Sequence, residues 1–184
     1  MLDEHHQPYY LMIRIIAAGD RKLMSQLNQW LAPRWVRTWM VWASRAGDGW
    51  LWVGIGLALL VFGGAQRFDA LEAGFISVGA GIVTFQVLKR VTGRTRPSGL
   101  ETHRWASLLP PDRFSFPSGH TITAFCVAVP LGLFYPALLV GLVFCAMSVA
   151  ASRVLLGLHY LTDVLAGIVI GSGLGVAAFW WSAG

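Results

Sequence analysis

Long apolar stretches separated by short polar segments make up most of the chain from residue 50 onward. The runs 50–64, 73–88 and 164–181 each predict one membrane-spanning helix. The apolar run 121–151 is too long for one span and has prolines near its middle, which predicts two helices with a very short connection. The pattern therefore predicts an all-α, polytopic membrane bundle of about five transmembrane helices.

The first 46 residues follow a different pattern, in which basic residues alternate with Leu, Ile, Met and Trp at roughly helical spacing. No uncharged run between residues 9 and 46 reaches the roughly 17–20 residues that a span requires. The segment predicts one or two interfacial amphipathic helices, broken near Pro33. We expect one domain over residues 1–184, with an interfacial N-terminal segment at 1–46 and a transmembrane catalytic core at 47–184.

Composition and charge agree with a membrane protein. The chain is 55% hydrophobic and only 12% charged, which excludes an ordinary soluble domain. Its net charge of +5 does not indicate nucleic acid, because the basic residues flank apolar runs instead of forming a polar stretch with exposed aromatics. The partners we expect are the bilayer and an anionic lipid headgroup. The oligomeric state is not encoded in these patterns.

Charged residues become rare after Gly119, where Asp, Glu, Lys, Arg and His together occur at four positions. With five spans, the end of the second span, the polar loop 90–117, the start of the third, the end of the fourth and the start of the fifth all lie on one face of the membrane. Polar residues that are far apart in sequence therefore converge: Lys89, Arg96, His120, Arg153, His159 and Asp163.

His159 and Asp163 are four positions apart, so on a helix they share a face and the carboxylate can reach an imidazole nitrogen. Such a pairing fixes the tautomer and leaves the other ring nitrogen free to attack. Lys89, Arg96 and Arg153 would add three cations around one histidine. This set predicts a site for a dianion.

The segment Pro117-Ser118-Gly119-His120-Thr121 has the features of a helix N-terminus. The unpaired N–H groups and the dipole of such an end favour a phosphate, and glycine allows a close approach. His120 would stand beside that anion, where it could protonate a leaving oxygen. The residues thus predict phosphoryl transfer without a metal or other cofactor.

Three segments together resemble the motifs of the type 2 phosphatidic acid phosphatase (PAP2) superfamily. They are Lys89-x6-Arg96-Pro97, Pro117-Ser118-Gly119-His120 and Ser152-Arg153-x5-His159-x3-Asp163, complete and in order. The similarity covers roughly residues 50–180. The superfamily includes bacterial phosphatidylglycerophosphatase B and undecaprenyl-diphosphate phosphatases, and it extends to vanadium haloperoxidases.

The resemblance implies a role for each matched position. His159 would be the nucleophile that forms a phosphohistidine, Asp163 its orienting partner and His120 the general acid. Lys89, Arg96 and Arg153 would hold the phosphate oxygens, with Ser118 and the Gly119 amide completing the cradle. Water would then hydrolyse the phosphoenzyme, and no metal would be required. Many relatives have six spans, whereas interfacial helices replace the first one here.

The function that we expect is therefore hydrolysis of a lipid phosphate monoester or diphosphate. Undecaprenyl diphosphate, phosphatidylglycerophosphate and phosphatidate are the candidate substrates, and the short chain with little structure outside the membrane favours the first. Two alternatives remain open at this point: a vanadate-dependent haloperoxidase, whose relatives are generally soluble and much larger, and a non-hydrolytic lipid carrier or scaffold, which would need only the cations.

The resemblance also implies a location in the bacterial plasma (inner) membrane with the site on the periplasmic, outer face. The basic residues crowd onto the catalytic side, which the positive-inside rule would place in the cytoplasm. We expect an outward site despite this conflict.

Other motif-like residues have simpler interpretations. The remaining basic residues of the polar loop are expected to be solvated or to face headgroups: Arg90, Arg94, His103, Arg104 and Arg113. Gly167-x3-Gly171 lies inside an apolar span, where it predicts close helix packing. A metal site at His5 and His6 is not expected.

Overall fold

A computed structural model describes residues 8–97 and 114–184; His5, His6, His103, Arg104 and Arg113 lie outside the described residues. Within them the regular secondary structure is helical, apart from a single β-bridge between Thr95 and Phe114. The helices are α1 (Pro8–Gln29), α2 (Arg34–Ala46), α3 (Trp50–Phe62), α4 (Arg67–Thr92), α5 (Gly119–Phe134), α6 (Leu139–Leu155) and α7 (Leu161–Ala183). Short 3₁₀ turns, η2 (Gly64–Gln66) and η4 (Pro136–Leu138), precede α4 and α6. The predicted all-α membrane bundle is confirmed.

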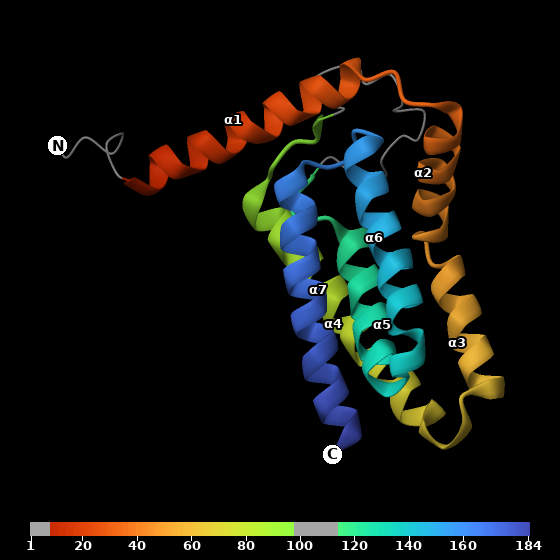
Figure 1. The fold of residues 1–184 in the computed structure, drawn as a ribbon. Coiled ribbons are helices and arrows are strands. Elements are labelled where there is room, and N and C mark those ends of the chain that lie inside the picture. The colour runs from red at the N-terminus through yellow and green to blue at the C-terminus, as the bar shows by residue number, and fades with distance from the viewer. Residues whose placement is uncertain (1–7, 98–113) are drawn as a thin grey trace.

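Helix α5 occupies the middle of the bundle, with α4, α6 and α7 packed around it (Figure 1). Its first turn lies farther from the upper end of the bundle than the end of α6 and the start of α7 (Figure 1). The helix is mostly buried along its length, and four of its residues are wholly inaccessible: Ile122, Ala124, Cys126 and Ala128. Close packing with α7 depends on small residues. A Cβ at Gly171 would lie 2.6 Å from the carbonyl oxygen of Ile122. Gly167, Gly171 and Gly175 of α7 therefore serve helix contact, as the sequence predicted, whereas a Cβ at Gly173 would meet no atom within 4 Å.

Three segments are long and apolar enough to cross a membrane: Gly64–Thr92, Pro136–Leu155 and Leu161–Ala183. Helices α2 and α3 pass the same test only as a pair, bent by 62°. Helix α5, with 16 residues, is shorter than a full span. The apolar runs therefore form the five helices α3 to α7. α3 reaches the length of a span only together with α2, and α5 is shorter than a span.

The two N-terminal helices lie differently from each other. α1 crosses the upper end of the bundle (Figure 1), and it carries exposed apolar side chains, which include Leu11, Met12 and Ile15. α2 instead runs beside α6, where a Cβ at Gly47 would lie 2.7 Å from Val149. α2 packs against α6 through a narrow face that buries Met40 and Ser44. The interfacial placement of the segment 9–46 stays a prediction.

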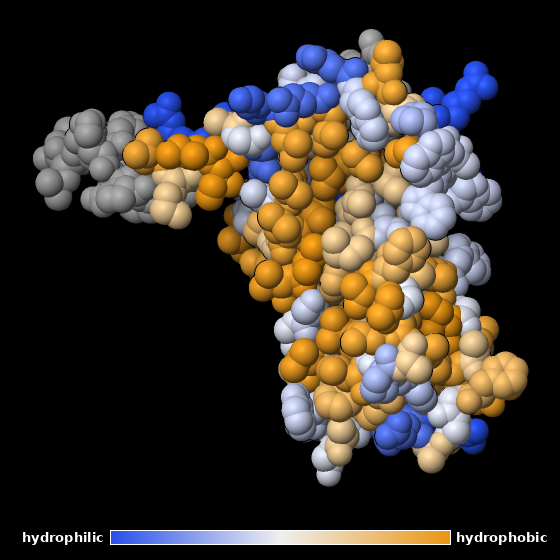
Figure 2. Space-filling view, viewed as in Figure 1, coloured by the Kyte–Doolittle hydropathy of each residue, from blue (hydrophilic) through white to orange (hydrophobic). Residues whose placement is uncertain are grey.

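The surface is divided as a membrane protein requires. Apolar residues cover the visible flank of the bundle, and hydrophilic residues gather at its upper end and in a smaller patch at its lower end (Figure 2). The α3–α4 and α5–α6 turns lie at the lower end, while the ends of α4 and α6 and the start of α7 lie at the upper end (Figure 1). The motif residues therefore belong to one polar end.

Candidate active site

His159 is delivered to the site by the short turn between α6 and α7. Gly157, with a φ of +71°, reverses the chain after α6, and the amides of Leu158 and His159 both donate to the carbonyl of Arg153 at 3.0 Å. A left-handed residue after a helix end is the usual place for glycine. The side chain of His159 is 1% exposed.

Both ring nitrogens of His159 have defined neighbours. Nδ1 lies 2.7 Å from the carbonyl oxygen of Ser115, which fixes Nδ1 as the protonated nitrogen because a carbonyl only accepts. Nε2 lies 3.0 Å from an Arg96 guanidinium nitrogen, which only donates. The hydrogen-bond network thus assigns a neutral imidazole whose Nε2 lone pair faces a cation.

Electrostatics keep that imidazole neutral. Burial lowers the pKa of His159 well below its ordinary value, and the positive charges of Arg96, Arg153 and Lys89 lower it further. The three cations predicted from the motifs therefore do converge on His159, from the segment after α4, the end of α6 and the end of α4. A neutral imidazole is the nucleophilic form.

Asp163 lies near His159, but its carboxylate does not form a close hydrogen bond with the imidazole. Its Oδ2 atom is 3.6 Å from Nδ1 of His159 and instead accepts the main-chain N–H of Tyr160 at 2.9 Å. Its Oδ1 atom accepts from Arg94 at 2.8 Å. The imidazole is therefore oriented by Ser115, and Asp163 fixes the start of α7 beside it.

The expectation that Arg94 is a solvated or headgroup-facing loop charge is wrong, because Arg94 pairs with two carboxylates. Its guanidinium bonds Asp163 and, at 2.7 Å, Asp20 of α1, and it lies 4.2 Å from the ring centroid of Tyr160. Gly93, with a φ of +58°, ends α4 and turns the chain so that Arg94 and Arg96 point back over the bundle.

His120 is the second residue of α5, and its Nε2 atom lies 2.7 Å from Oδ1 of Asp48. Asp48 belongs to the break between α2 and α3. Burial lowers the pKa of His120, and the positive charges of Arg153 and Arg96 lower it further, so the two histidines share one cationic environment. The Asp48 carboxylate acts in the opposite direction and favours the imidazolium that a proton donor requires.

The N-terminus of α5 supplies backbone donors, as the motif predicts. The first main-chain hydrogen bond at this end runs from Ile122 to Ser118, so the amides of residues 119–121 are those that a helix leaves without an internal partner. Ser118 itself is fully buried: its N–H donates to the Asp163 carbonyl and its hydroxyl accepts from Thr121. Ser118 thus ties α5 to α7. The amides of residues 119–121 lie at a helix N-terminus, a position that favours an anion.

Several residues at the site carry no motif signal. Ser115 orients His159, Asp48 contacts His120, and Ser44 of α2 accepts from Arg153 at 2.6 Å. Only Asp48 has a local signal, as a lone acid between two glycines where two apolar helices meet. Among residues 8–97 and 114–184, no group of three His, Cys, Asp or Glu side chains could hold a metal ion.

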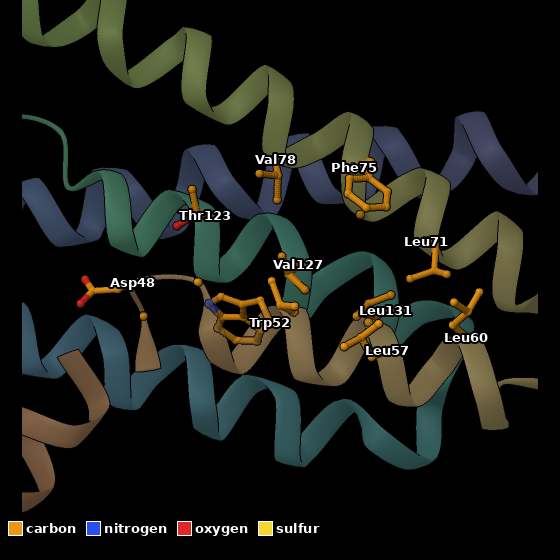
Figure 3. A pocket seen from close by; sticks show the side chains of 15 residues that line it. Asp48, Trp52, Leu57, Leu60, Leu71, Phe75, Val78, Thr123, Val127 and Leu131 are labelled. Atoms are coloured by element: carbon orange, nitrogen blue, oxygen red, sulfur yellow. The ribbon is translucent and has the colours of Figure 1, made fainter. Parts of the chain in front are cut away.

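An apolar cleft of about 450 Å³ opens between α3, α4 and α5. Figure 3 shows Asp48 at one end of it and Leu60 and Leu71 at the other, with the Trp52 ring between. The indole N–H of Trp52 is buried, has no hydrogen-bond partner among the described residues, and points toward the end where Asp48 lies. The cleft therefore runs from a polar end near His120 along an apolar wall.

Comparison with known proteins identifies the family to which this arrangement belongs. A family profile described as the PAP2 superfamily matches residues 70–184, more than half of the chain. The chain belongs to the PAP2 superfamily. With its apolar helices, it is a multi-pass membrane protein of that superfamily.

Individual PAP2 relatives match different shares of the chain. A lipid A 1-phosphatase from Rhizobium johnstonii is 34% identical over 47% of this chain and 37% of its own length. An undecaprenyl-diphosphatase from Sulfolobus acidocaldarius is 31% identical over 72% of this chain and 64% of its own length. The chain thus spans less than two thirds of these curated relatives.

A PAP2 crystal structure confirms the fold. The transmembrane phosphatidylglycerolphosphate phosphatase from Bacillus subtilis superposes with a TM-score of 0.72 and 24% identity, covering 97% of this chain and 89% of that one. The likeness extends over the N-terminal helices as well as the PAP2 profile region, so α1 and α2 are part of the shared architecture.

Proposed function

We propose that this chain is a membrane lipid-phosphate phosphatase that cleaves a phosphate monoester or diphosphate of a lipid through a phosphohistidine. One observation carries the proposal: the buried His159 is held by Ser115 with its Nε2 lone pair toward Arg96, among three cations. A site built only to bind a headgroup would not require an oriented, neutral imidazole at its centre.

In the first step, Nε2 of His159 attacks phosphorus, the bond from phosphorus to the lipid oxygen breaks, and that oxygen takes a proton from His120. Lys89, Arg96 and Arg153 balance the charge of the phosphoryl oxygens, assisted by amides of residues 119–121. Asp48 stabilises the imidazolium form of His120 before transfer. Asp163 keeps the start of α7, and with it the His159 turn, in place.

In the second step, a water molecule attacks phosphorus, the P–N bond to His159 breaks, and His120 takes the proton of the water. Inorganic phosphate leaves and His159 returns to its neutral form. The phosphate-binding set is therefore Lys89, Arg96, Ser118, Gly119 and Arg153, and the catalytic set is His159, His120 and Asp163. The reaction as written uses no cofactor.

The substrate that we propose keeps its tail in the bilayer while its phosphate enters the cationic end. The apolar cleft between α3, α4 and α5 supports this, since its polar end carries Asp48, the partner of His120. Undecaprenyl diphosphate is our first candidate, because the undecaprenyl-diphosphatase relative matches 72% of this chain, compared with 47% for the lipid A 1-phosphatase relative. Phosphatidylglycerophosphate, phosphatidate and lipid A follow.

We further propose that residues 1–184 act as one catalytic domain in the plasma (inner) membrane, with the site on the outer face. Cysteines at Gln29, exposed at the site end of α1, and Ala65, exposed at the opposite end, can test the orientation. A membrane-impermeant maleimide should label Gln29→Cys in intact cells and Ala65→Cys only after permeabilisation. The reverse pattern would place the site in the cytoplasm.

The activity is tested by phosphate release from the purified protein in detergent with EDTA, using each of the four lipids. His159→Asn is the informative variant, because its amide can still donate to Ser115 but cannot attack phosphorus. Asp69→Asn, a charge removal at the exposed start of α4 in the opposite end of the bundle, is the matched control.

Release by the wild type and Asp69→Asn but not by His159→Asn would support the proposal, and trapping of ³²P on the wild type would support the covalent step. Binding of a lipid without release from any of the four would instead favour a carrier or scaffold. Release that EDTA abolishes would overturn the metal-independent mechanism.

A further inference from the structure

A polar network attaches the turn that carries His159 to the N-terminal helix α1. It links the motif residue Asp163 to Asp20, Arg94 and Thr162, for which the motifs specify no residue. Asp20 of α1 is 3% exposed, although it lies on a helix that otherwise crosses the end of the bundle. Its Oδ2 atom accepts from Arg94 at 2.7 Å and from the Thr162 hydroxyl. Its Oδ1 atom accepts from the Thr162 main-chain N–H at 3.3 Å.

Each member of this network has its donors and acceptors matched. One guanidinium nitrogen of Arg94 donates to Asp20, and the other donates to the Thr162 hydroxyl at 2.7 Å and to Asp163 at 2.8 Å. The Thr162 hydroxyl accepts from Arg94 and donates to Asp20. Arg94 is thus held between two carboxylates, with the Tyr160 ring against its face.

This arrangement limits how Arg94 binds Asp163. An arginine with a single carboxylate partner prefers a two-point contact to both oxygens. Here only Oδ1 of Asp163 meets Arg94, and Oδ2 remains with the Tyr160 amide, immediately after His159. Without Asp20, Arg94 would be free to take both oxygens or to turn toward an incoming phosphate, and the Tyr160 amide would lose its acceptor.

We propose that Asp20 is a positioning residue for the nucleophile, acting through Arg94 and Asp163 on the turn that carries His159. The proposal rests on the proposed function in so far as the turn serves catalysis. It assigns to α1 a task beyond lying at the membrane surface: α1 supplies the acid that holds the catalytic turn in one arrangement. Loss of that acid affects the chemical step, not substrate affinity.

The test compares Asp20→Asn and Asp20→Glu with Asp69→Asn. Asp20→Asn is expected to lower kcat on the order of tenfold or more, since small misplacements of a reacting group have effects of that size, while KM changes less than twofold. Asp20→Glu, which keeps the charge, should recover part of the loss. Asp69→Asn should match the wild type.

A double-mutant cycle separates positioning from simple anchoring of α1. In an Asp163→Asn background the effect of Asp20→Asn on kcat should largely disappear, because the path from Asp20 to His159 passes through Asp163. An equal loss of kcat in both backgrounds would overturn the proposal. So would a rise in KM with kcat unchanged, because that outcome assigns Asp20 to substrate binding.

Hydrogen exchange of the peptide covering residues 156–163 provides a readout without substrate. Exchange should increase in Asp20→Asn and remain unchanged in Asp69→Asn; equal exchange in both would overturn the proposal. If the wild type hydrolyses no lipid, the proposed function fails while this measurement still decides the role of Asp20. Should Asp20→Asn not fold, Thr162→Val opens the same network without leaving a charge unpaired, and the same increase is expected.

Discussion

The Nε2 atom of His120 lies 2.7 Å from Oδ1 of Asp48, a residue 72 positions earlier in the chain. The contact joins the start of α5 to the break between α2 and α3. It also links the proposed proton donor to the apolar cleft, since Asp48 lines the polar end of that cleft. The group proposed to protonate the leaving oxygen is therefore held by the wall along which the lipid tail is proposed to lie.

Replacement of Asp48 by Asn should impair proton donation by His120. We expect kcat for a lipid substrate to fall about ten- to hundredfold, less than the roughly 10²–10⁴-fold that general acid catalysis contributes, because His120 itself is retained. An aryl phosphate, whose leaving oxygen needs little protonation, should be affected much less. Rates for both substrates, with Asp69→Asn as control, check this; equal losses for both would contradict the role of Asp48 as a partner of the acid.

Trp52→Phe should weaken lipid binding. The Trp52 ring lines the cleft in which the lipid tail is proposed to lie, and the smaller Phe ring offers that tail less apolar surface. A loss of about 1 kcal/mol of contact raises KM roughly fivefold. A water-soluble phosphate ester without a tail should show an unchanged KM, and an unchanged KM for the lipid as well would remove Trp52 from the binding site.

A side chain that fills the cleft should also raise KM for the lipid and leave KM for a water-soluble phosphate ester unchanged. Gly74 lines the cleft, and a Cβ there meets no atom within 4 Å, so Gly74→Phe can place its ring in the cleft without a backbone clash. Gly79→Phe on the same helix, also unobstructed but exposed and outside the cleft lining, is the matched control. We expect Gly74→Phe alone to raise KM for long-chain lipids. Parallel behaviour of the two variants would argue against the cleft as the tail site.

The buried neutral state of His159 predicts a dependence of stability on pH. Burial and three cations lower its pKa in the folded protein, whereas in the unfolded chain it titrates near 6.5. Below about pH 6.5 the unfolded state therefore takes up a proton that the folded state excludes, and the stability contributed by this residue declines as the pH falls. In His159→Asn this contribution is absent.

The measurement is the apparent melting temperature of wild type and His159→Asn in the same detergent between pH 7.5 and 5.5. The melting temperature of the wild type relative to the variant should decrease toward acidic pH. A difference that stays constant would mean that His159 becomes protonated in the folded protein as readily as in the unfolded chain.

The contact between α5 and α7 predicts a contrast between two neighbouring glycines. A Cβ at Gly171 would lie 2.6 Å from the Ile122 carbonyl, whereas a Cβ at Gly173 meets no atom within 4 Å. Gly171→Ala should therefore cost about 1–3 kcal/mol through overpacking, with a lower melting temperature, and Gly173→Ala should not. Similar behaviour of both variants would show that α7 can move away from α5 without loss.

The sequence predicted much of this protein because its strongest signals are local. Apolar runs of bilayer length specify helices, since a backbone in lipid must satisfy its own hydrogen bonds. The parity of those runs then brings Lys89, Arg96 and Arg153 to the end that holds His159, where their charges act on it. The helix start at Gly119 was also predictable, from residues suited to that position.

The N-terminal helices were harder to place because their pattern is ambiguous. An amphipathic helix with arginines and tryptophans can lie in the interface or pack against a neighbour, and composition does not distinguish the two. In the structure α2 packs beside α6, and Gly47, which follows α2, lies close to Val149 of α6. The position of α2 in the bundle then brings Ser44 to Arg153, a contact that no periodicity indicates.

The sequence by itself determined which residues are proposed to carry the chemistry and at which end of the membrane bundle they gather, because helix formation in lipid and the order of spans follow from the chain alone. Only the tertiary structure decided what holds them: Ser115 on Nδ1 of His159, Asp48 on His120, and Asp20 with Arg94 on Asp163. These contacts join residues up to 74 positions apart. Their partners are single polar residues whose surroundings exist only after the helices have packed.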